Sequence, residues 1–464
     1  MEPNSMTIIE TAKCILKEGP VCDSCLGRQF GKLSTGLTNA QRGFAIKAEM
    51  SMQAAADDDK ETQKLLAPAF PQARKVLGIS QEKDEECWLC RGLFQDTQNI
   101  LKWADRCVDA AKDFEYDTLL VGTRVPPLYS EKEEVIWAEC SVKHAEPLKS
   151  ELNREVGKAV SMKTGKEVDF KRPDVVFTIE LAADKIELKV NSLFIYGRYN
   201  KFSRDIPQTR WPCRECGGSG LKDDKECEHC GGKGKLYPSS VEEEINHAVK
   251  IMFKADDAIL HGAGREDIDG RMLGDGRPFV MEAVNPRIRW VDLTELMGQI
   301  NDHAAGKVSV SELHYVDKST VEAVKSIKLN KTYRLKVIYK DDISLETLKS
   351  SLATLSNSEI LQWTPQRVAH RRADLERKRK VYEAVLEELN EAEKYFVITV
   401  RSEGGLYVKE LVSGDNGRTK PSLSDLLGKE CRVIELDVIN VEGGISWQDH
   451  MAKEKRPGTS SQRR

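Results

Sequence analysis

Apolar and polar positions follow two rhythms along the C-terminal half of the chain. At 239–255, apolar side chains recur every three or four positions behind Ser240, and Glu243 completes the spacing typical of a helix N-terminus. Helices are also predicted at 344–355 and 381–394. Strands are predicted at four runs rich in β-branched and aromatic residues: 277–286, 331–340, 394–404 and 431–443. We therefore expect an α+β domain with a largely antiparallel central sheet.

The N-terminal half begins with helical periodicity and then becomes mixed. Residues 39–56 have a helical pattern and lead into an acidic segment at 56–64 that we expect to be exposed. An amphipathic helix is predicted at 146–165, followed by two or three alternating strands within 174–197. These elements predict a second, mixed α/β domain.

Length and composition set outer limits on the interpretation. A chain of 464 residues is too long for one hydrophobic core, so several domains are expected. Its 40% hydrophobic and 31% charged residues are typical of a soluble globular protein. No apolar run approaches the ~18–20 residues that span a bilayer, so no membrane association is expected. The first residues also lack a basic segment before a long apolar core, which favours a cytoplasmic location.

The cysteines form the clearest local motif. Eight of the twelve fall in four CxxC pairs, and in a cytosolic chain this usage indicates metal rather than disulfides. Cys213 and Cys216 precede Cys227 and Cys230 by a short loop, with glycines after each pair. Four thiolates at about 2.3 Å complete a tetrahedral zinc site with no open position, so the ion would be structural. A redox dithiol is the alternative, which two matched glycine-flanked pairs fit less well.

A second set of cysteines is more widely spaced. Cys22 and Cys25 are separated from Cys87 and Cys90 by 61 residues. The similar flanks, CLG and CRG, favour a shared zinc ion, although the spacing also allows two unrelated pairs. One or two structural zinc ions are therefore expected. The remaining cysteines are scattered: Cys14, Cys107, Cys140 and Cys431.

Two basic segments depart from the formal net charge of −4. Segment 194–214 has five Lys or Arg residues against one acidic residue, and segment 363–380 has seven against two. Basic groups can follow phosphates while interleaved aromatic rings stack on unpaired bases. A single basic segment is more often a solvated surface than an RNA-binding site. With two such segments and the cysteine knuckles, RNA binding becomes as good a hypothesis as a solvated surface. Candidate RNA-binding residues in them are Arg198, Arg210, Arg371 and Arg372.

The stretch 262–279, GAGREDIDGRMLGDGRPF, combines four acidic residues, three arginines and five glycines. It has no Ser–His pairing and no P-loop lysine. A carboxylate beside an arginine stays ionised and oriented, which suits a nucleophile or a base. Arg265 and Arg271 are candidate substrate-binding residues here. A surface loop without a catalytic role is the alternative. The aspartates of the stretch are Asp267, Asp269 and Asp275.

Four motifs resemble a known family. AGRED, with an Asp two residues after an Arg, is similar to the catalytic loop of pseudouridine synthases. The longer GREDIDGRMLGDGRPFVMEAVNP resembles the Pus-ten family of tRNA pseudouridine synthases. So do CDSCLGRQFG, FIYGRYNKFSRDIPQTRWPC and GLYVKELVSGDNGRTKPSLSDLLG, in family order along nearly the whole chain. The knuckle at 213–230 resembles the archaeal branch. Gly270 is a departure, because a β-branched residue is usual there.

The resemblance implies isomerisation of uridine-54 and uridine-55 in the tRNA T-loop, without an organic cofactor and after flipping of the base. It implies that Asp267 is the catalytic carboxylate, as nucleophile or base, and that Lys409 pairs with it. Tyr333 would stack against the target base and Leu426 would pack beneath it. Without the resemblance these last three read as core or strand-end residues. The glycines of the stretch would let the flipped nucleotide approach the backbone closely.

The resemblance also divides the chain and names its partner. The N-terminal module would grip the acceptor end of tRNA and set its distance from the pocket. No protein partner is implied. The expected parts are a zinc-binding region at 1–92, a THUMP-containing RNA-binding domain at 93–210, a zinc knuckle at 211–237, a pseudouridine synthase catalytic domain at 238–452 and a disordered tail at 453–464.

Two other function classes share some of these features. A zinc-knuckle RNA chaperone is one, because CRECGGSG and CEHCGGKG resemble the repeats of DnaJ-type co-chaperones. That class has four repeats and an HPD loop, whereas this chain has two repeats and no HPD. A THUMP-linked RNA methyltransferase is the other, and it would need a Gly-rich cofactor loop after a first strand. The C-terminal half contains no such loop in that setting.

Overall fold

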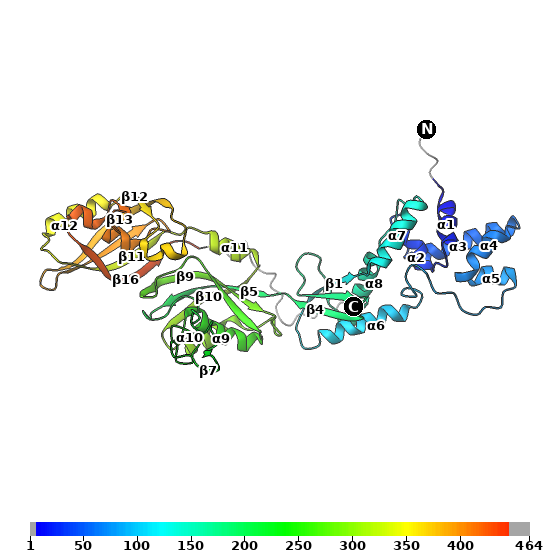
Figure 1. The fold of residues 1–464 in the computed structure, drawn as a ribbon, viewed down its shortest axis with the longest axis horizontal. Coiled ribbons are helices and arrows are strands. Elements are labelled where there is room, and N and C mark those ends of the chain that lie inside the picture. The colour runs from blue at the N-terminus through cyan, green and yellow to red at the C-terminus, as the bar shows by residue number, and fades with distance from the viewer. Residues whose placement is uncertain (1–5, 445–464) are drawn as a thin grey trace, which may run out of the picture. The chain divides into compact units, whose positions relative to one another are not determined.

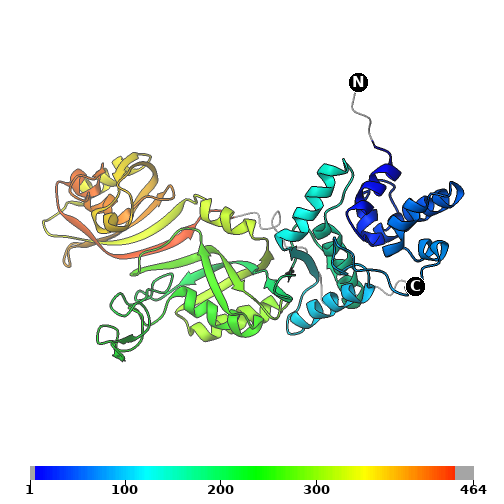
Figure 2. The same cartoon turned by 45° about the vertical axis from the view of Figure 1, so that its right-hand side comes forward.

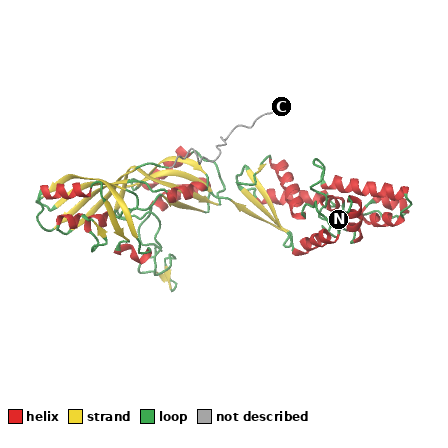
Figure 3. Ribbon diagram, turned by 90° about the horizontal axis from the view of Figure 1, so that it is seen from above, coloured by secondary structure: helices red, strands yellow, loops and turns green. Residues whose placement is uncertain are grey.

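The computed structural model describes residues 6–444 of the chain. Contacts divide the chain into two compact units, Met1–Asn191 and Ser192–Arg464. Helices predominate in the first unit and strands in the second (Figure 3). Within the described part, no helix is both long and apolar enough to cross a bilayer.

The first unit begins with a helical subdomain around its own hydrophobic core. Its first and third helices start at Thr7 and Thr38, where each threonine forms a reciprocal capping box with a Glu or Gln three residues later. Ile15, Leu26 and Phe70 lie in the core that these helices enclose. The elements are α1 (Ile8–Lys17), α2 (Asp23–Arg28), α3 (Asn39–Ala56), α4 (Lys60–Leu66), the 3-10 turn η1 (Ala67–Ala69) and α5 (Pro71–Leu77).

The rest of the first unit is a four-stranded sheet with helices packed against it. The strand order is β2-β1-β3-β4, with β1 parallel to β2 and β3 and with β4 antiparallel to β3. Val175, Phe177 and Ile179 point from β3 into the core that α6 and α8 cover. The elements are α6 (Thr97–Ala110), β1 (Thr118–Arg124), α7 (Pro127–Glu139), α8 (Leu148–Thr164), β2 (Glu167–Val168), β3 (Val175–Glu180) and β4 (Lys185–Val190). The amphipathic helix predicted at 146–165 is α8.

The second unit is built on a ten-stranded sheet whose order is β10-β5-β9-β16-β11-β14-β13-β12-β15, with β8 added beside β9. Strands β9, β16 and β11 lie next to one another at the centre of the sheet (Figure 1). The strands are β5 (Leu193–Lys201), β8 (Asp257–Gly262), β9 (Gly270–Val284), β10 (Val308–Val316), β11 (Lys331–Tyr339), β12 (Glu359–Trp363), β13 (Glu376–Asn390), β14 (Tyr395–Ser402), β15 (Thr419–Lys420) and β16 (Cys431–Val441). Of the described pairings in this sheet, β9–β16 is parallel and the rest are antiparallel, which confirms the expected largely antiparallel sheet.

Helices and a small hairpin surround this sheet. Helix α9 starts at Ser240, whose hydroxyl accepts a hydrogen bond from the Glu243 amide, as the sequence predicted. Figure 2 includes the β6–β7 hairpin, which belongs to the cysteine knuckle. These elements are β6 (Leu221–Lys222), β7 (Lys225–Glu226), α9 (Val241–Phe253), α10 (Leu293–Ala304), α11 (Ser319–Ser326), α12 (Leu345–Leu355), η2 (Gln366–Arg371), α13 (Val408–Ser413) and α14 (Leu423–Leu427).

The helix predicted at 381–394 is wrong, because most of this segment lies in β13. That strand pairs with β14, and its register shifts between Val381 and Glu383 and again between Leu386 and Glu388. Each shift inserts an extra residue, so inward-facing positions fall three apart instead of two. This spacing imitates a helix in the sequence. Tertiary pairing then outweighs the helical preference of a segment rich in Glu, Ala and Leu.

The boundary between the units also differs from the one expected at residue 210. Strand β5 pairs with β9 along Leu193–Lys201 and with β10 on its other side. These pairings draw the first basic segment into the second unit, so the division falls after Asn191. The tail expected to be disordered at 453–464 lies outside the described residues.

Candidate active site and cysteine clusters

Asp267 lies in a short loop between β8 and β9. The stretch 262–279 is not a single loop, because the part from Gly270 onward belongs to strand β9. A Cβ at Gly274 would meet the main-chain oxygen of Ile439 at 2.1 Å, so this glycine lets two strands approach. Gly276 has a φ of +75°, and a Cβ added there would lie 2.7 Å from the main-chain oxygen of Tyr199. The expectation that these glycines make room for a nucleotide is thus wrong for Gly274 and Gly276.

Gly270, where the family resemblance predicts a β-branched residue, begins β9 opposite Leu436 of β16. A Cβ added at Gly270 would lie 3.0 Å from the Leu436 side chain. The glycine therefore accommodates the bulk of Leu436 at the start of the parallel β9–β16 pair.

Each oxygen of the Asp267 carboxylate faces a different cation. Arg367 Nη1 donates to Asp267 Oδ1 at 3.0 Å. Lys409 Nζ lies 3.4 Å from Asp267 Oδ2, and closer, at 2.7 Å, to Asp269 Oδ2. The structure thus brings Lys409 to Asp267, but Lys409 makes its shorter contacts with Asp269. Burial raises the pKa of Asp269, but the hydrogen bond from Lys409 outweighs burial and holds this pKa below its usual value.

A buried lysine holds the backbone of this loop. Lys201 Nζ, at the end of β5, donates to the main-chain oxygens of Ile206, Asp267 and Ile268 at 3.0, 3.3 and 2.7 Å. Burial lowers the pKa of Lys201. On the other side, Arg204 Nη1 donates to the main-chain oxygen of Asp269 at 3.0 Å. The loop that carries Asp267 is therefore held at its main chain.

A second buried network lies beside the start of the loop. Arg277 Nε is 3.0 Å from Glu266 Oε2, with both side chains almost fully buried. Tyr199 Oη donates to the same carboxylate at 2.9 Å, and Gln208 donates to both Tyr199 Oη and the Gly264 oxygen at 2.8 Å. Buried ion pairs with these additional hydrogen bonds fix geometry. The sequence analysis predicted neither this network nor the role of Lys201, because their contacts join separate segments of the chain.

Tyr333 and Leu426 lie on two different elements of the second unit. Tyr333 is in β11 and is 7% exposed, and burial raises its pKa to about 12, so its phenol stays protonated at neutral pH. The positive charge of Arg277 lowers the pKa of Tyr333, and the negative charge of Asp267 raises it. Leu426, in α14, is partly buried against the main core.

Two of the predicted substrate-binding arginines are held by the protein itself. Arg198 is 6% exposed, and its guanidinium donates to the main-chain oxygens of Asp275 at 2.6 Å and Gly276 at 2.9 Å. Arg198 thus bonds to the neighbouring strand, and its role as an RNA contact stays a prediction. Arg271 donates two hydrogen bonds to the Asp437 carboxylate, at 2.9 and 2.6 Å, which occupy one edge of its guanidinium.

The other predicted arginines differ in their surroundings. Arg265 lies over the Trp211 ring, with its guanidinium carbon 5.3 Å from the ring centroid, so the β8–β9 loop contacts the start of the cysteine knuckle. Arg210 is exposed. Arg372 is exposed and donates to Tyr407 Oη at 3.1 Å. Arg371 ends η2.

The structure brings both sets of cysteines together. In each set the four sulfur atoms lie within 4.8 Å of one another, as two clusters: Cys22, Cys25, Cys87 and Cys90, and Cys213, Cys216, Cys227 and Cys230. A tetrahedral zinc ion with Zn–S bonds of about 2.3 Å places its sulfur ligands about 3.8 Å apart. Sγ–Sγ distances of 3.8 Å in the first cluster and of 4.0 and 3.8 Å in the second fit that geometry. Zinc therefore suits both donor sets.

The surroundings of the first cluster suit an anionic metal site. Arg28 Nη1 donates to Cys25 Sγ at 2.7 Å, and its Nε donates to Glu133 Oε1 at 3.0 Å. Glu151 lies 3.9 Å from the same guanidinium. Arg28 is fully buried, so its charge offsets the negative charge that four thiolates bring. Through Glu133 in α7 and Glu151 in α8, Arg28 also connects the cluster to these two helices.

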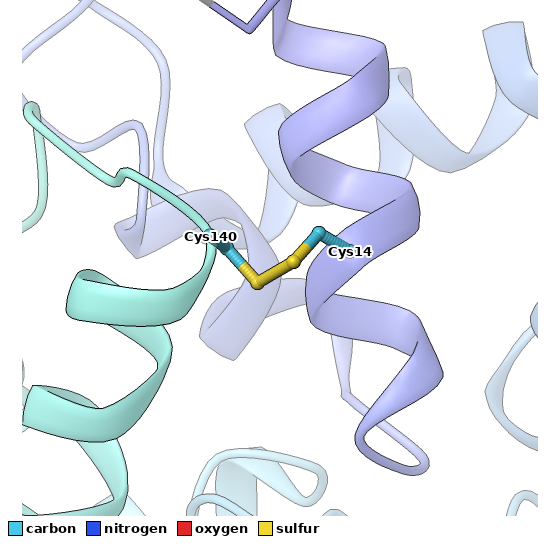
Figure 4. Close-up of a disulfide and its surroundings, with 2 residues drawn as sticks. All are labelled: Cys14 and Cys140. Atoms are coloured by element: carbon cyan, nitrogen blue, oxygen red, sulfur yellow. A yellow bond between two sulfur atoms is a disulfide. The ribbon is translucent and has the colours of Figure 1, made fainter.

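A disulfide joins two of the scattered cysteines, Cys14 in α1 and Cys140 after α7 (Figure 4). The expectation that the cysteines serve metal rather than disulfides is therefore wrong for this pair. The two positions are 126 residues apart, and neither belongs to a CxxC motif. Both lie in or against the same helical core, where their Cα atoms are 5.6 Å apart.

The chain matches two family models. Residues 194–442 match "Pus10, C-terminal", and residues 103–180 match "Pus10 THUMP domain, archaeal". The first match covers the sheet beside which Asp267 lies, and the second covers strands β1, β2 and β3 of the sheet of the first unit.

Curated relatives match over almost their full length. The tRNA pseudouridine synthase Pus10 of Methanothrix thermoacetophila is 48% identical, covering 94% of this chain and 95% of the relative. The enzyme of the same name from Halorubrum lacusprofundi is 44% identical, over 94% of this chain and 97% of the relative. Among solved structures, a Cbf5–Nop10–Gar1 complex aligns with 43% of this chain and 45% of that chain, at 15% identity and a TM-score of 0.28.

Proposed function

The chain belongs to the Pus10 family of tRNA pseudouridine synthases, and from this premise we propose that it isomerises uridine-54 and uridine-55 of the tRNA T-loop, with Asp267 as the catalytic carboxylate. The family activity is an isomerisation of uridine to pseudouridine in tRNA. The product keeps every atom of uridine, so no external oxidant, reductant or group donor is required. No organic cofactor is therefore part of the proposal. Because tRNA is the substrate, we also propose a cytoplasmic location.

The pairing of Asp267 with two cations carries the assignment. Arg367 and Lys409 each lie against one oxygen of Asp267, and an ionised carboxylate is the form that attacks a nucleoside or removes a ribose proton. The bond between uracil N1 and ribose C1′ then breaks, the base turns, and C5 bonds to C1′. The bond from Asp267 to the ribose breaks again, or the ribose regains the proton that Asp267 removed. C5 finally loses its proton and N1 gains one. The target base must first leave its stack. The main-chain contacts of Lys201 keep the loop in place during these steps.

Tyr333 and Leu426 complete the proposed pocket. The neutral Tyr333 phenol, whose pKa burial and the charge of Asp267 raise, offers a flat ring that suits stacking against a flipped uracil. Because Tyr333 is 7% exposed, stacking requires a small opening of the loops around it. Leu426 supplies an apolar contact below.

Binding of tRNA is proposed to involve both units. In the second unit, Arg210, Arg371, Arg372 and Arg265 remain the candidate phosphate contacts. In the first unit, the THUMP domain is proposed to hold the acceptor end, which would fix the distance between that end and the T-loop.

Structural zinc is proposed in both cysteine clusters. The fit of their sulfur spacings to a tetrahedral ion supports this, as does Arg28 beside the first cluster. In the knuckle, the amides of Gly220 and Gly234 donate to the sulfurs of Cys216 and Cys230 at 3.3 and 3.2 Å, an arrangement that stabilises thiolate ligands. Four-sulfur sites leave no open position, so these ions would support the fold rather than the chemistry.

Incubation of unmodified tRNA with the pure protein tests the T-loop assignment. We expect pseudouridine at positions 54 and 55 when the tRNA is mapped, without added S-adenosylmethionine. Transcripts with cytidine at position 54 or 55 separate the two sites, because cytidine cannot be converted. Pseudouridine only at other positions would leave the family activity standing and remove the T-loop assignment.

Replacing Arg371 and Arg372 with Ala is expected to weaken tRNA affinity and to flatten its salt dependence. Each lost phosphate contact lowers the slope of log affinity against log salt by about 0.7–0.9, so the double change should lower it by about 1.4–1.8. Filter binding over a range of salt concentrations measures the slope. The control is Arg334→Ala, which breaks an ion pair with Glu387. An unchanged slope in the double variant would show that these arginines do not contact tRNA.

A further inference from the structure

Arg367 makes the shortest cation contact to the proposed catalytic carboxylate. Its Nη1 is 3.0 Å from Asp267 Oδ1, whereas Lys409 Nζ is 3.4 Å from Asp267 Oδ2 and 2.7 Å from Asp269. Lys409 therefore divides its charge between two aspartates. On these distances, Arg367 is the cation that orients Asp267 most directly.

A second carboxylate anchors Arg367. Its Nε donates to Glu410 Oε1 at 2.6 Å, and the Glu410 side chain is only 6% exposed. A buried carboxylate is costly unless it is paired, so Glu410 strongly favours this position of the guanidinium. The same guanidinium lies 5.9 Å from the centroid of the Tyr407 ring, which limits its movement further.

The bridge uses the fork of the arginine side chain. Nε points to Glu410 in α13 while Nη1 points to Asp267 in the β8–β9 loop, so one rigid group links two elements. Asp267 itself is held at its main chain by Lys201. Without Arg367, the loop backbone would remain in place, but the carboxylate would lose its closest side-chain contact.

We propose that Arg367 is a positioning residue: anchored by the buried Glu410, it holds Asp267 Oδ1 so that the other oxygen is aimed at the nucleoside. This rests on the proposed catalytic role of Asp267. The arginine acts through the carboxylate and not on the RNA, so its loss should slow the chemical step and leave tRNA binding nearly intact. Small errors in the placement of a reacting group can cost about 10²-fold in rate.

Single-turnover experiments with excess enzyme test the positioning role of Arg367. They measure the rate of the chemical step and the half-saturating enzyme concentration separately. We expect Arg367→Ala to lower the rate by about 10–100-fold with little change in half-saturation. Arg367→Lys keeps the charge, but one ammonium cannot bridge both carboxylates, so its rate should stay nearer to that of the Ala variant. Arg334→Ala is the matched control, because it breaks an ion pair of similar exposure in the same unit, 45% against 37% for the arginine side chains.

A double-mutant cycle tests the role of Glu410. Glu410→Gln should slow the chemical step in the same direction, and the double variant Arg367→Ala/Glu410→Gln should be no slower than Arg367→Ala alone, because both changes break the same bridge. The double variant also removes the buried charge that Arg367→Ala leaves unpaired, so it reports on the mechanism if the single variant folds poorly.

Three results would overturn the inference. A wild-type rate for Arg367→Ala is one, and a loss confined to half-saturation, which indicates an RNA contact, is another. The third is an equal loss in Arg334→Ala, which indicates general destabilisation. Asp267→Asn, measured in parallel, separates the two levels of the argument. If Asp267→Asn is inactive and Arg367→Ala is fully active, only the positioning role fails, whereas an active Asp267→Asn removes the proposed site itself.

Discussion

Asp267→Asn is expected to abolish pseudouridine formation while the protein still binds tRNA. Asn has nearly the same size and can accept the hydrogen bond from Arg367, but it can act neither as nucleophile nor as base. We expect the single-turnover rate to fall by on the order of 10³-fold or more. Affinity for tRNA should stay within a few-fold, because the change removes a negative charge and not a phosphate contact. Mapping of pseudouridine and filter binding on the same preparation measure both quantities.

Asp269→Asn and Asp275→Asn are the matched controls for this experiment. Asp269 holds Lys409 at 2.7 Å, so its loss frees Lys409 to approach Asp267 and should leave measurable activity. Asp275 lies within β9, and its loss should have less effect. If Asp267→Asn makes pseudouridine at an appreciable rate, or if Asp269→Asn alone abolishes it, Asp267 is not the catalytic residue.

Loss of the first cysteine cluster is expected to cause the largest fall in stability. The protein purified without chelator should contain two zinc ions per chain, one for each cluster. Structural zinc contributes about 10–16 kcal/mol of apparent binding energy, as much as the whole stability of a typical domain. Cys22, Cys25, Cys87 and Cys90 lie inside the helical core of the first unit, so Cys87→Ser should remove one ion and unfold that core. Metal analysis and thermal unfolding of the full chain measure these effects.

The knuckle and a free cysteine provide comparisons. Cys227→Ser should also remove one ion but lower stability less, because the knuckle closes a short loop and lies outside the hydrophobic cores of the described residues. Cys107→Ser, at a buried cysteine that belongs to neither cluster, should leave the zinc content unchanged. A measured content of about one ion or fewer in the wild-type chain would contradict the shared site of the distant pairs.

Some features of this protein could be predicted because they depend on neighbouring residues. The knuckle of Cys213, Cys216, Cys227 and Cys230 is a local loop, so its spacing alone predicts the cluster that the structure contains. The helix at Ser240 and the strands around Tyr333 follow from capping and alternation over a few positions. The family motifs likewise singled out Asp267 and Lys409, which the structure brings to within 3.4 Å of each other.

The sequence could not predict contacts that join distant segments. The sequence left open whether Cys22 and Cys25 share a site with Cys87 and Cys90. The register shifts of β13, which led to a wrong helix, depend on its pairing with β14. Arg198 stood in a basic segment like an RNA contact, yet its partners are the main-chain oxygens of β9.

The residues of the candidate site also fall into two groups, those that sequence motifs identify and those that only the fold brings to the site. Asp267 and Lys409 were named from their motifs, whereas Arg367 and Glu410 were not, although one stands in the second basic segment and the other directly follows Lys409. Arg367 meets Asp267 across 100 residues of chain, and it does so because η2 and the β8–β9 loop converge on α13. Residue types and local spacing determine which groups are capable of the chemistry. Only the packing of distant elements decides which of these groups meet, because a charge at the surface of one segment is a buried partner once another segment covers it.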